Sequence, residues 1–288
     1  MKLTLLTLLT LLAFAANSLV NRGALQYELI GPGEFALLRV TFGALTLFAL
    51  LTWRNKYWPK PKPIQFKGVA ALAIYIVGFS YAYVNLDAGL GALIVFGTVQ
   101  VVMFAVAAFA GERLSIYRWI GAAVAFVGLV ILCWPDKNTS LPIASLLLML
   151  MAGFGWAFYS LEGRRVSDPL LTSTWNFIYV VPITLIVLIM AGDTLVITFN
   201  GVLLAFVSGA LMSGLGYALW YWVLPQLEVT VSALAQLLVP VFALILGALL
   251  LQEVVSLRTT LSAALIVGGV AVGSLLKSRS HLTPSGET

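Results

Sequence analysis

The chain has 288 residues, of which 61% are apolar and only 9% are charged. So little polar surface cannot cover a soluble globule of this size, and the composition therefore predicts an integral membrane protein. The formal net charge of +5 comes from basic residues spread over short polar connections, which fits membrane topology and argues against a nucleic-acid partner. The single cysteine, Cys133, excludes an internal disulfide framework and a cysteine-based metal cluster.

Apolar runs between polar breaks predict an all-α protein with ten transmembrane helices, each near the roughly 20 residues that cross a bilayer core. Their approximate ranges are 3–21, 34–53, 65–84, 89–110, 116–134, 143–163, 170–191, 200–223, 229–250 and 256–276. The first run, with Lys2 ahead of it and small residues at Ala13 and Ala15, resembles a signal peptide. We interpret it as a retained helix, because its removal would leave the sixth helix without a counterpart.

Residues 86–132 recur, degenerate but in register, as residues 227–273. Glu112 aligns with Glu253, a separation of 253 − 112 = 141 residues, and Ser115 aligns with Ser256. A repeat this long in one register predicts two related halves. Because each half has an odd number of helices, the second must enter the membrane from the opposite side, so the repeat is inverted. The predicted division is a first five-helix repeat at 1–137, a second at 138–276 and a polar tail at 277–288.

Lysine and arginine residues predict the orientation of the chain. With the N-terminus in the cytoplasm, twelve of them fall on the cytoplasmic side, namely Lys2, Arg54, Lys56, Lys60, Lys62, Lys67, Arg113, Arg118, Arg164, Arg165, Lys277 and Arg279. Only Arg22, Lys137 and Arg258 fall on the other side. Both termini, including the tail, are therefore predicted to be cytoplasmic. Arg39 lies within the second span near Glu34, and we interpret it as a snorkelling or paired side chain close to the outer interface.

Two acidic residues stand in the tight connections of the repeated block. Glu112 lies in Gly-Glu-Arg-Leu-Ser (111–115) and Glu253 in Gln-Glu-Val-Val-Ser (252–256). We predict that both glutamates stabilise these turns rather than contact substrate. Ser115 and Ser256 are predicted N-caps of the helices that follow, since a hydroxyl there can accept a hydrogen bond from an unpaired backbone N–H.

The repeated block also resembles a known family. In the first copy, the residues that carry the resemblance are Asp87, Gly91-Ala92, Gly111 to Ser115, Trp119 to Ala123 and Gly128. In the second copy they are Ser232-Ala233-Leu234, Pro240, Glu253 and Gly268-Gly269. This pattern is similar to the helix-four and helix-five block of the drug/metabolite transporter superfamily, in its EamA-type ten-helix permeases.

The resemblance covers essentially the whole chain. It implies a transporter, often an exporter, of small metabolites such as amino acids, with a central cavity that faces alternate sides of the membrane. Two departures bear on the substrate rather than the fold: Val99 stands where the second half has Pro240, and Ala16-Asn17 replaces a Trp-Gly pair often found in the first helix.

Signals of catalysis are absent from the sequence. The one histidine, His281, lies in the polar tail, Cys133 has no cysteine partner, and no Gly-rich phosphate loop occurs. We therefore expect no enzyme activity, no cofactor and no metal, and ATP-driven pumping by this chain alone is excluded. The acidic residues lie at or near span ends, which favours facilitated diffusion or exchange, with proton coupling through Glu162 or Glu34 as the alternative. A polytopic enzyme or lipid-intermediate handling protein remains the alternative class; it requires a deep polar dyad or a metal site.

Inverted-repeat transporters bind substrate near the bilayer midplane, so polar and aromatic residues within the spans are the candidates for a binding site. They are Asn17, Tyr75, Phe79, Tyr83, Gln100, Trp156, Tyr159, Trp175, Asn176, Tyr179, Tyr217, Trp220, Tyr221 and Gln236. Tyr75, Phe79 and Tyr83 recur every four residues and form one helix stripe. An aromatic cavity suits apolar and aromatic amino acids in particular.

Two prolines lie within predicted spans, where each removes a backbone hydrogen bond. Pro182 and Pro240 are candidate hinges for gating, and kinks that serve only packing are the alternative. Gly269 and Gly273 form a small-residue pair suited to close helix contact, either within the chain or between two copies, so the protein is expected as a monomer or homodimer. The expected partners are a small-molecule substrate and membrane lipid, and the expected location is the cell (inner) membrane.

Overall fold

A computed structural model describes residues 2–109, 115–134, 142–163, 166–192, 195–223, 226, 235–236 and 238–275 of the chain. Nearly all of these residues are helical, and the described part contains no β-strand beyond one isolated bridge between Ile30 and Ile197. The helices are α1 (Lys2–Gln26), α2 (Pro32–Asn55), α3 (Phe66–Ala82), α4 (Ala88–Phe109), α5 (Ile116–Cys133), α6 (Ile143–Gly163), α7 (Pro169–Ala191), α8 (Phe199–Phe206), η1 (Val207–Leu215), α9 (Gly216–Val223), α11 (Leu238–Leu250) and α12 (Leu257–Leu275). The predicted polar tail at 277–288 lies outside the described residues.

Seven of these helical stretches are long and apolar enough to cross a membrane, and the all-helical membrane class predicted from the sequence is thereby confirmed. They are Leu3–Gln26, Pro32–Asn55, Ala88–Val106, Ile116–Cys133, Ile143–Gly163, Pro169–Ala191 and Phe199–Trp220. Three further apolar helices are shorter, at Phe66–Ala82, Leu238–Leu250 and Leu257–Gly273. The count of ten spans, their inverted arrangement and the cytoplasmic termini stay predictions.

The outer faces of the helices carry large apolar side chains. Leu45 of α2, Phe154 of α6 and Ile186 of α7 are each about half exposed or more, although the polar fraction of the chain is very small. Contiguous exposed apolar surface of this kind marks contact with lipid rather than water. The protein is therefore a multi-pass membrane protein whose polar groups are mostly directed inward.

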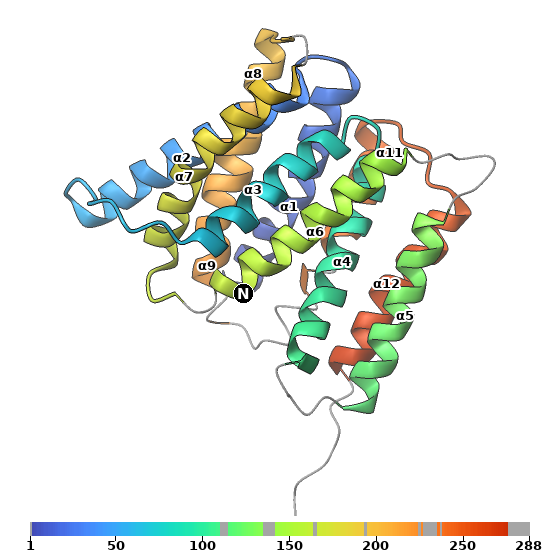
Figure 1. Ribbon diagram of the computed structural model, residues 1–288. Coiled ribbons are helices and arrows are strands. Elements are labelled where there is room, and N and C mark those ends of the chain that lie inside the picture. Colours follow the sequence, from blue (N-terminus) through green and yellow to red (C-terminus); the bar gives the residue numbers. More distant parts are fainter. Residues whose placement is uncertain are drawn as a thin grey trace, which may run out of the picture.

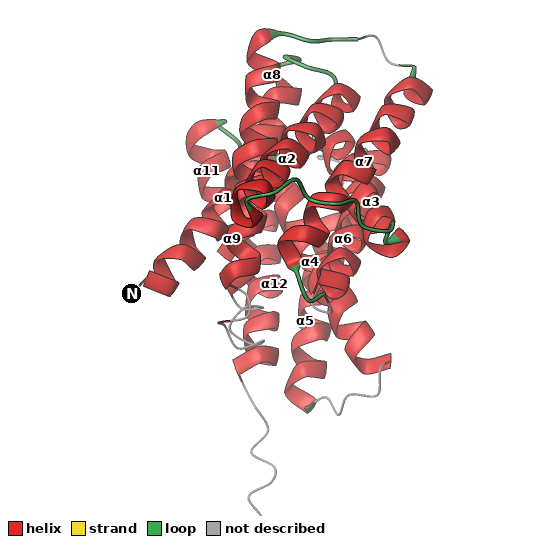
Figure 2. Cartoon of the chain, turned by 90° about the vertical axis from the view of Figure 1, so that its left-hand side faces the viewer, coloured by secondary structure: helices red, strands yellow, loops and turns green. Residues whose placement is uncertain are grey.

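The helices form one bundle with a two-helix unit at its edge. Figure 1 shows α5 and α12 side by side, and α4 packs against both this pair and α6. Figure 2, turned by 90°, shows that loops only connect helices and build no layer of their own. In the main bundle, α3 packs on α6, α2 on α7, and α1 on α11, α9 and η1.

Glycines allow α5 and α12 to approach closely. A Cβ atom at Gly121 would lie 2.3 Å from the carbonyl oxygen of Gly269 and 2.7 Å from the backbone nitrogen of Gly273. No side chain fits at such distances, so the two backbones touch directly. The small-residue pair at Gly269 and Gly273 therefore serves a contact inside the chain.

The predicted eighth span, 200–223, contains a feature that hydropathy does not reveal. It is built from α8, η1 and α9 in succession, and η1 is a π-helix of nine residues. Long π-helices are rare and occur mainly at functional sites. Ser208-Gly209 and Ser213-Gly214 lie in this segment. Because each hydrogen bond of a π-helix spans five residues, the two serines lie on the same side of the helix, about one turn apart.

Candidate functional site

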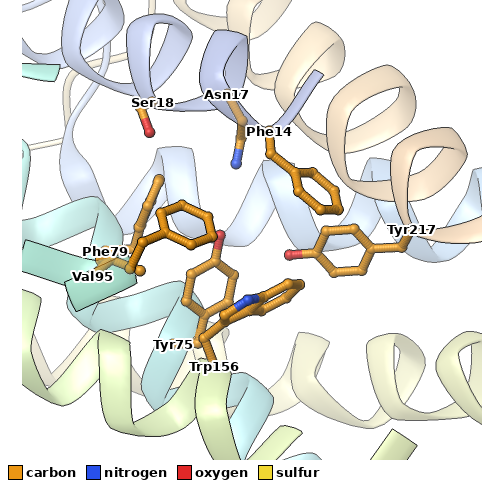
Figure 3. Close-up of a pocket in the computed structure, with 9 residues that line it drawn as sticks. Phe14, Asn17, Ser18, Tyr75, Phe79, Val95, Trp156 and Tyr217 are labelled. Atoms are coloured by element: carbon orange, nitrogen blue, oxygen red, sulfur yellow. The ribbon is translucent and has the colours of Figure 1, made fainter. Parts of the chain in front are cut away.

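A small buried cavity lies where five helices of the main bundle meet (Figure 3). Its lining comes from α1, α3, α4, α6 and α9: Phe14, Asn17, Ser18, Tyr75, Phe79, Val95, Phe96, Trp156 and Tyr217. Five of the candidate binding residues come together there, namely Asn17, Tyr75, Phe79, Trp156 and Tyr217. The sequence did not single out Phe14 and Ser18, because an apolar ring and a lone hydroxyl in a span carry no distinctive signal.

Aromatic rings form most of the cavity wall. The Trp156 ring centroid lies 4.9 Å from that of Tyr75 and 5.0 Å from that of Tyr217. Phe79 stacks on the other side of Tyr75 at 5.2 Å, and Phe14 meets Trp156 edge-on at 6.0 Å. These separations lie in the range that favours aromatic pairs, so the rings stabilise one another around the cavity.

Polar atoms face the same space. The side-chain oxygen of Asn17 accepts a hydrogen bond from the Ser208 hydroxyl at 2.6 Å. This bond holds the amide so that its nitrogen points between the rings, as does the hydroxyl of Tyr217 (Figure 3). The indole nitrogen of Trp156 is buried and makes no hydrogen bond to a described residue. The cavity thus presents hydrogen-bond donors on an aromatic background.

Arg39 lies directly behind this wall. Its side chain is 0% exposed, and its Nη2 donates to the Tyr75 hydroxyl at 3.0 Å while its Nε donates to Ser213 at 3.2 Å. The guanidinium carbon lies 4.9 Å from the centroid of the Phe79 ring and 5.2 Å from that of Tyr75. Both distances are within the range of cation–π attraction.

The interpretation of Arg39 as a snorkelling or paired side chain close to the outer interface was wrong. A fully buried guanidinium does not reach the interface, and the Glu34 carboxylate instead accepts a hydrogen bond from the Val196 N–H at 3.1 Å. Sequence distance placed Arg39 near Glu34 on one helix, but five residues on a helix turn the two side chains to different faces. In the sequence, the two Ser-Gly pairs of η1 were the feature that could have indicated polar groups facing Arg39.

A second small cavity lies at the ends of α6 and α7. It is lined by Gln65, Tyr159, Glu162, Gly163, Val166, Pro169, Thr172, Ser173 and Asn176. Two candidate residues, Tyr159 and Asn176, therefore belong here, and the Tyr159 hydroxyl donates to Ser173 at 3.2 Å. Glu162 is partly buried in this lining, which keeps it available as the alternative proton-coupling group.

The remaining aromatic candidates pack around these cavities. Tyr83 is fully buried against Phe79, and Trp220 meets the Phe14 ring edge-on. Trp175 packs on Tyr179, whose hydroxyl donates to the backbone oxygen of Lys62. The side chain of Tyr221, in α9, lies outside the described part of the structure.

The two glutamine candidates lie apart from the cavities. Gln100 is half-buried on α4 and Gln236 is buried, and neither is among the described residues that line either cavity. The predicted hinges are both helical, since Pro182 lies inside α7 and Pro240 in α11. Within the described ranges, no group of three His, Cys, Asp or Glu side chains could hold a metal ion.

The turn residues connect helices at their ends. The Glu253 carboxylate accepts from the backbone N–H groups of Ala88 and Gly89, at 2.6 and 3.3 Å, and so caps the start of α4. Burial raises the pKa of the Glu253 carboxyl above its ordinary value, and these donors offset part of that rise. Ser115 accepts from the Arg118 N–H and Ser256 from the Thr259 N–H, while Glu112 lies outside the described residues.

Apolar helices around an aromatic, donor-lined cavity define a multi-pass membrane protein of the transporter class. The chain belongs to the EamA-like transporter family, whose sequence model matches residues 1–134 and 143–275. It is 42% identical over 268 residues to an uncharacterised protein of Pseudomonas aeruginosa, covering 93% of each chain. It is 24% identical to the uncharacterised transporter YoaV of Bacillus subtilis, covering 87% of this chain and 89% of that one.

A solved crystal structure has the same fold. It superposes with a TM-score of 0.69 over 96% of this chain and 99% of the other, at 19% sequence identity. The similarity supports the arrangement of the helices and, at this identity, carries no statement about the substrate. The match of the family model, and not this superposition, confirms the family assignment that the sequence indicated.

Proposed function

We propose that the protein exports small organic metabolites such as amino acids, apolar and aromatic ones in particular, through the central cavity by alternating access. The observation that carries the proposal is the convergence of the Tyr75, Trp156 and Tyr217 rings with the Asn17 amide at one buried point. Aromatic walls bind an apolar body by stacking and burial, and a few fixed donors orient its polar end. We place the protein in the cell (inner) membrane, as a monomer or homodimer.

Alternating access requires two halves that can rock against each other, and the helix packing supports such halves. The sequence register pairs α1 with α6, α2 with α7, α3 with the α8–α9 segment, α4 with α11 and α5 with α12. When each helix is replaced by its counterpart, the contact of α3 with α6 corresponds to the contact of α1 with η1 and α9. In the same way, the contact of α4 with α6 corresponds to that of α1 with α11. The contacts α2–α7, α4–α11 and α5–α12 map onto themselves. This pattern favours two five-helix repeats at 1–137 and 138–276.

Transport is tested with purified protein in liposomes. Uptake of labelled phenylalanine, tryptophan, leucine and a hydrophobic amine is measured against empty vesicles. Flux of the aromatic amino acids above that of empty vesicles supports the proposal. If none of these compounds shows such flux, amino acids are not the substrates. Release from preloaded cells that express the chain, compared with cells that do not, tests the outward direction.

The inverted repeat is tested separately from the substrate. Lys60, between α2 and α3, and Leu195, between α7 and α8, are exposed residues of equivalent loops. In a Cys133→Ser background, Lys60→Cys and Leu195→Cys should react with an impermeant thiol reagent from opposite sides of the membrane. Labelling of both from the same side contradicts the inversion.

A further inference from the structure

The Arg39 guanidinium is a buried charge that has no counter-ion among the described residues. The described residues form two ion pairs, Arg22–Asp87 and Arg54–Asp168, and neither includes Arg39. Its Nη1 is buried and makes no hydrogen bond to a described residue. An unneutralised charge inside a membrane protein is costly, and such groups mark substrate or ion sites. Two hydrogen bonds and two aromatic faces surround the charge, and an anion in the adjoining cavity would add a counter-charge that the described residues do not supply.

The Tyr75 hydroxyl connects this charge to the cavity. Its oxygen accepts from Arg39 Nη2 at 3.0 Å, and Tyr75 itself lines the cavity. Because its acceptor position is used by a cation, the hydroxyl proton can be donated into the cavity, and the donated bond is strengthened by the charge behind it. Tyr75 thus carries the effect of Arg39 to the ligand.

Two further hydrogen-bond donors belong to the cavity lining. The Asn17 amide nitrogen points into the cavity, and the buried Trp156 indole nitrogen carries an unused N–H donor. No acidic residue occurs among the nine described residues of the lining. Donors next to a cation are complementary to an anion, whereas an ammonium group would find no carboxylate among the described residues of the lining.

The π-helix η1 holds the two key polar groups in place. Ser208 binds the Asn17 oxygen at 2.6 Å, and Ser213, five residues later, binds Arg39 Nε at 3.2 Å. Gly209 allows η1 to lie against α2, since a Cβ there would be 2.3 Å from the backbone oxygen of Arg39. The cation and the amide are therefore preorganised before a ligand arrives.

We propose that the central cavity is a carboxylate site, in which the Tyr75 hydroxyl, held and polarised by Arg39, binds the carboxylate of an aromatic solute whose ring packs on Trp156. This inference rests on the proposed function, because it names the chemical group that the transport cavity selects. A carboxylate would accept a hydrogen bond from the Tyr75 hydroxyl, whose oxygen accepts from Arg39 Nη2 at 3.0 Å, so its negative charge would stand one hydroxyl away from the buried guanidinium. Neutral and cationic solutes of the same shape provide no negative charge near the Arg39 guanidinium and should bind less tightly.

The test measures binding, independently of flux. The probes are 3-phenylpropionate, its neutral amide and phenethylammonium, and the readout is the shift in unfolding temperature of the detergent-purified protein as each concentration is raised. We expect the carboxylate to bind at least roughly tenfold more tightly than the amide, as for a hydrogen bond to a charged group. The ammonium probe should bind most weakly.

Three variants locate the effect. Arg39→Met should remove the preference for carboxylate over amide while leaving the amide affinity within about twofold. Tyr75→Phe deletes only the hydroxyl and should reduce the preference without unfolding the protein, so it keeps the test valid if Arg39→Met does not fold. Arg258→Gln is the matched control, because this arginine binds the backbone oxygens of Ile131 and Leu132, at the end of α5. It should keep the full preference.

The outcomes separate this inference from the proposed function. Equal binding of carboxylate and amide by the wild type, or an unchanged preference in both Arg39→Met and Tyr75→Phe, overturns the carboxylate site. Absence of binding by all three probes overturns it as well. A carboxylate preference in detergent combined with no flux in liposomes supports the site and refutes transport, while flux without the preference does the reverse.

Discussion

The two stretches that match the family differ most at one buried position. Arg39 in α2 and Val180 in α7 occupy the same place in the register, since 180 − 39 = 141, and both are fully buried. Arg39 carries a charge with three nitrogen donor groups, and Val180 carries a short apolar side chain. A repeated helix plan therefore does not require a repeated site, because packing constrains the backbone more strongly than the identity of each buried side chain.

Positions that line the cavity also differ between the two halves. Asn17 of α1 lies in the cavity, whereas its counterpart Phe158 of α6 is 47% exposed. Trp156 of α6 lies in the cavity wall, and its counterpart is Ala15 of α1, which is fully buried. The first half thus contributes the buried cation and the amide, and the second half contributes the indole and the two serines of η1. Under the proposed function, the binding site therefore requires residues from both halves.

The largest expected effect comes from making the second half resemble the first. Val180→Arg buries a guanidinium among residues with no arranged partners and should lower the free energy of unfolding by roughly 3–5 kcal/mol. The measurement is the thermal unfolding of the detergent-purified protein. Val180→Leu is the control, because it changes volume without adding charge. Wild-type stability of the arginine variant would mean that α7 already has a site for a cation.

A smaller effect is expected from removing the second half's main contribution to the cavity wall. Trp156→Ala deletes the ring that lies against Tyr75 and Tyr217, and should weaken transport of aromatic solutes by about 1–3 kcal/mol more than that of small ones. The measurement is initial uptake of tryptophan against alanine in proteoliposomes. Trp53→Ala, at a ring that is 81% exposed, is the matched control and should leave the ratio unchanged. A proportional loss for both solutes would refute stacking at Trp156.

The smallest effect concerns an ion pair between the halves. The Arg54 guanidinium binds Asp168 at 2.6 Å and, with the Leu171 N–H, holds the pKa of that carboxyl below its ordinary value. A carboxyl whose pKa is lowered by folding stabilises the folded state above its unfolded pKa and loses this contribution as the pH falls through the folded pKa. Because both side chains are partly exposed, the contribution should stay below about 1 kcal/mol.

Asp168→Asn tests this contribution. The variant should unfold at a slightly lower temperature than the wild type at pH 7, and the difference should vanish at acidic pH, where the wild-type carboxyl is also neutral. Asp87→Asn, at the other ion pair, provides a comparison within the same protein. A difference between Asp168→Asn and wild type that grows on acidification would contradict the assigned sign of the pKa shift.

Hydropathy was sufficient to predict the membrane class and the approximate helix boundaries, and the residues of the repeated block indicated the family. A membrane helix needs about 20 apolar residues in a row, and this requirement acts locally along the chain. Tyr75, Trp156, Tyr217 and Asn17 could be proposed as cavity residues for a related reason, since polar and large aromatic groups within spans tend to face the protein interior. The sequence could not distinguish these four residues from Gln236, Gln100 or Trp175, which are also polar or aromatic residues within predicted spans.

Only the tertiary structure decided how Arg39 is used. A single arginine in an apolar run is compatible with snorkelling, pairing or ligand binding, and the choice depends on what the neighbouring helices present to it. Here α3 presents Tyr75 and Phe79, and the π-helix η1 presents Ser213, from positions 36 and 174 residues away in the chain. Contacts between residues so far apart in the chain depend on how the helices pack. The apolar side chains of a segment determine that it forms a span, but they do not determine which face of another span it contacts.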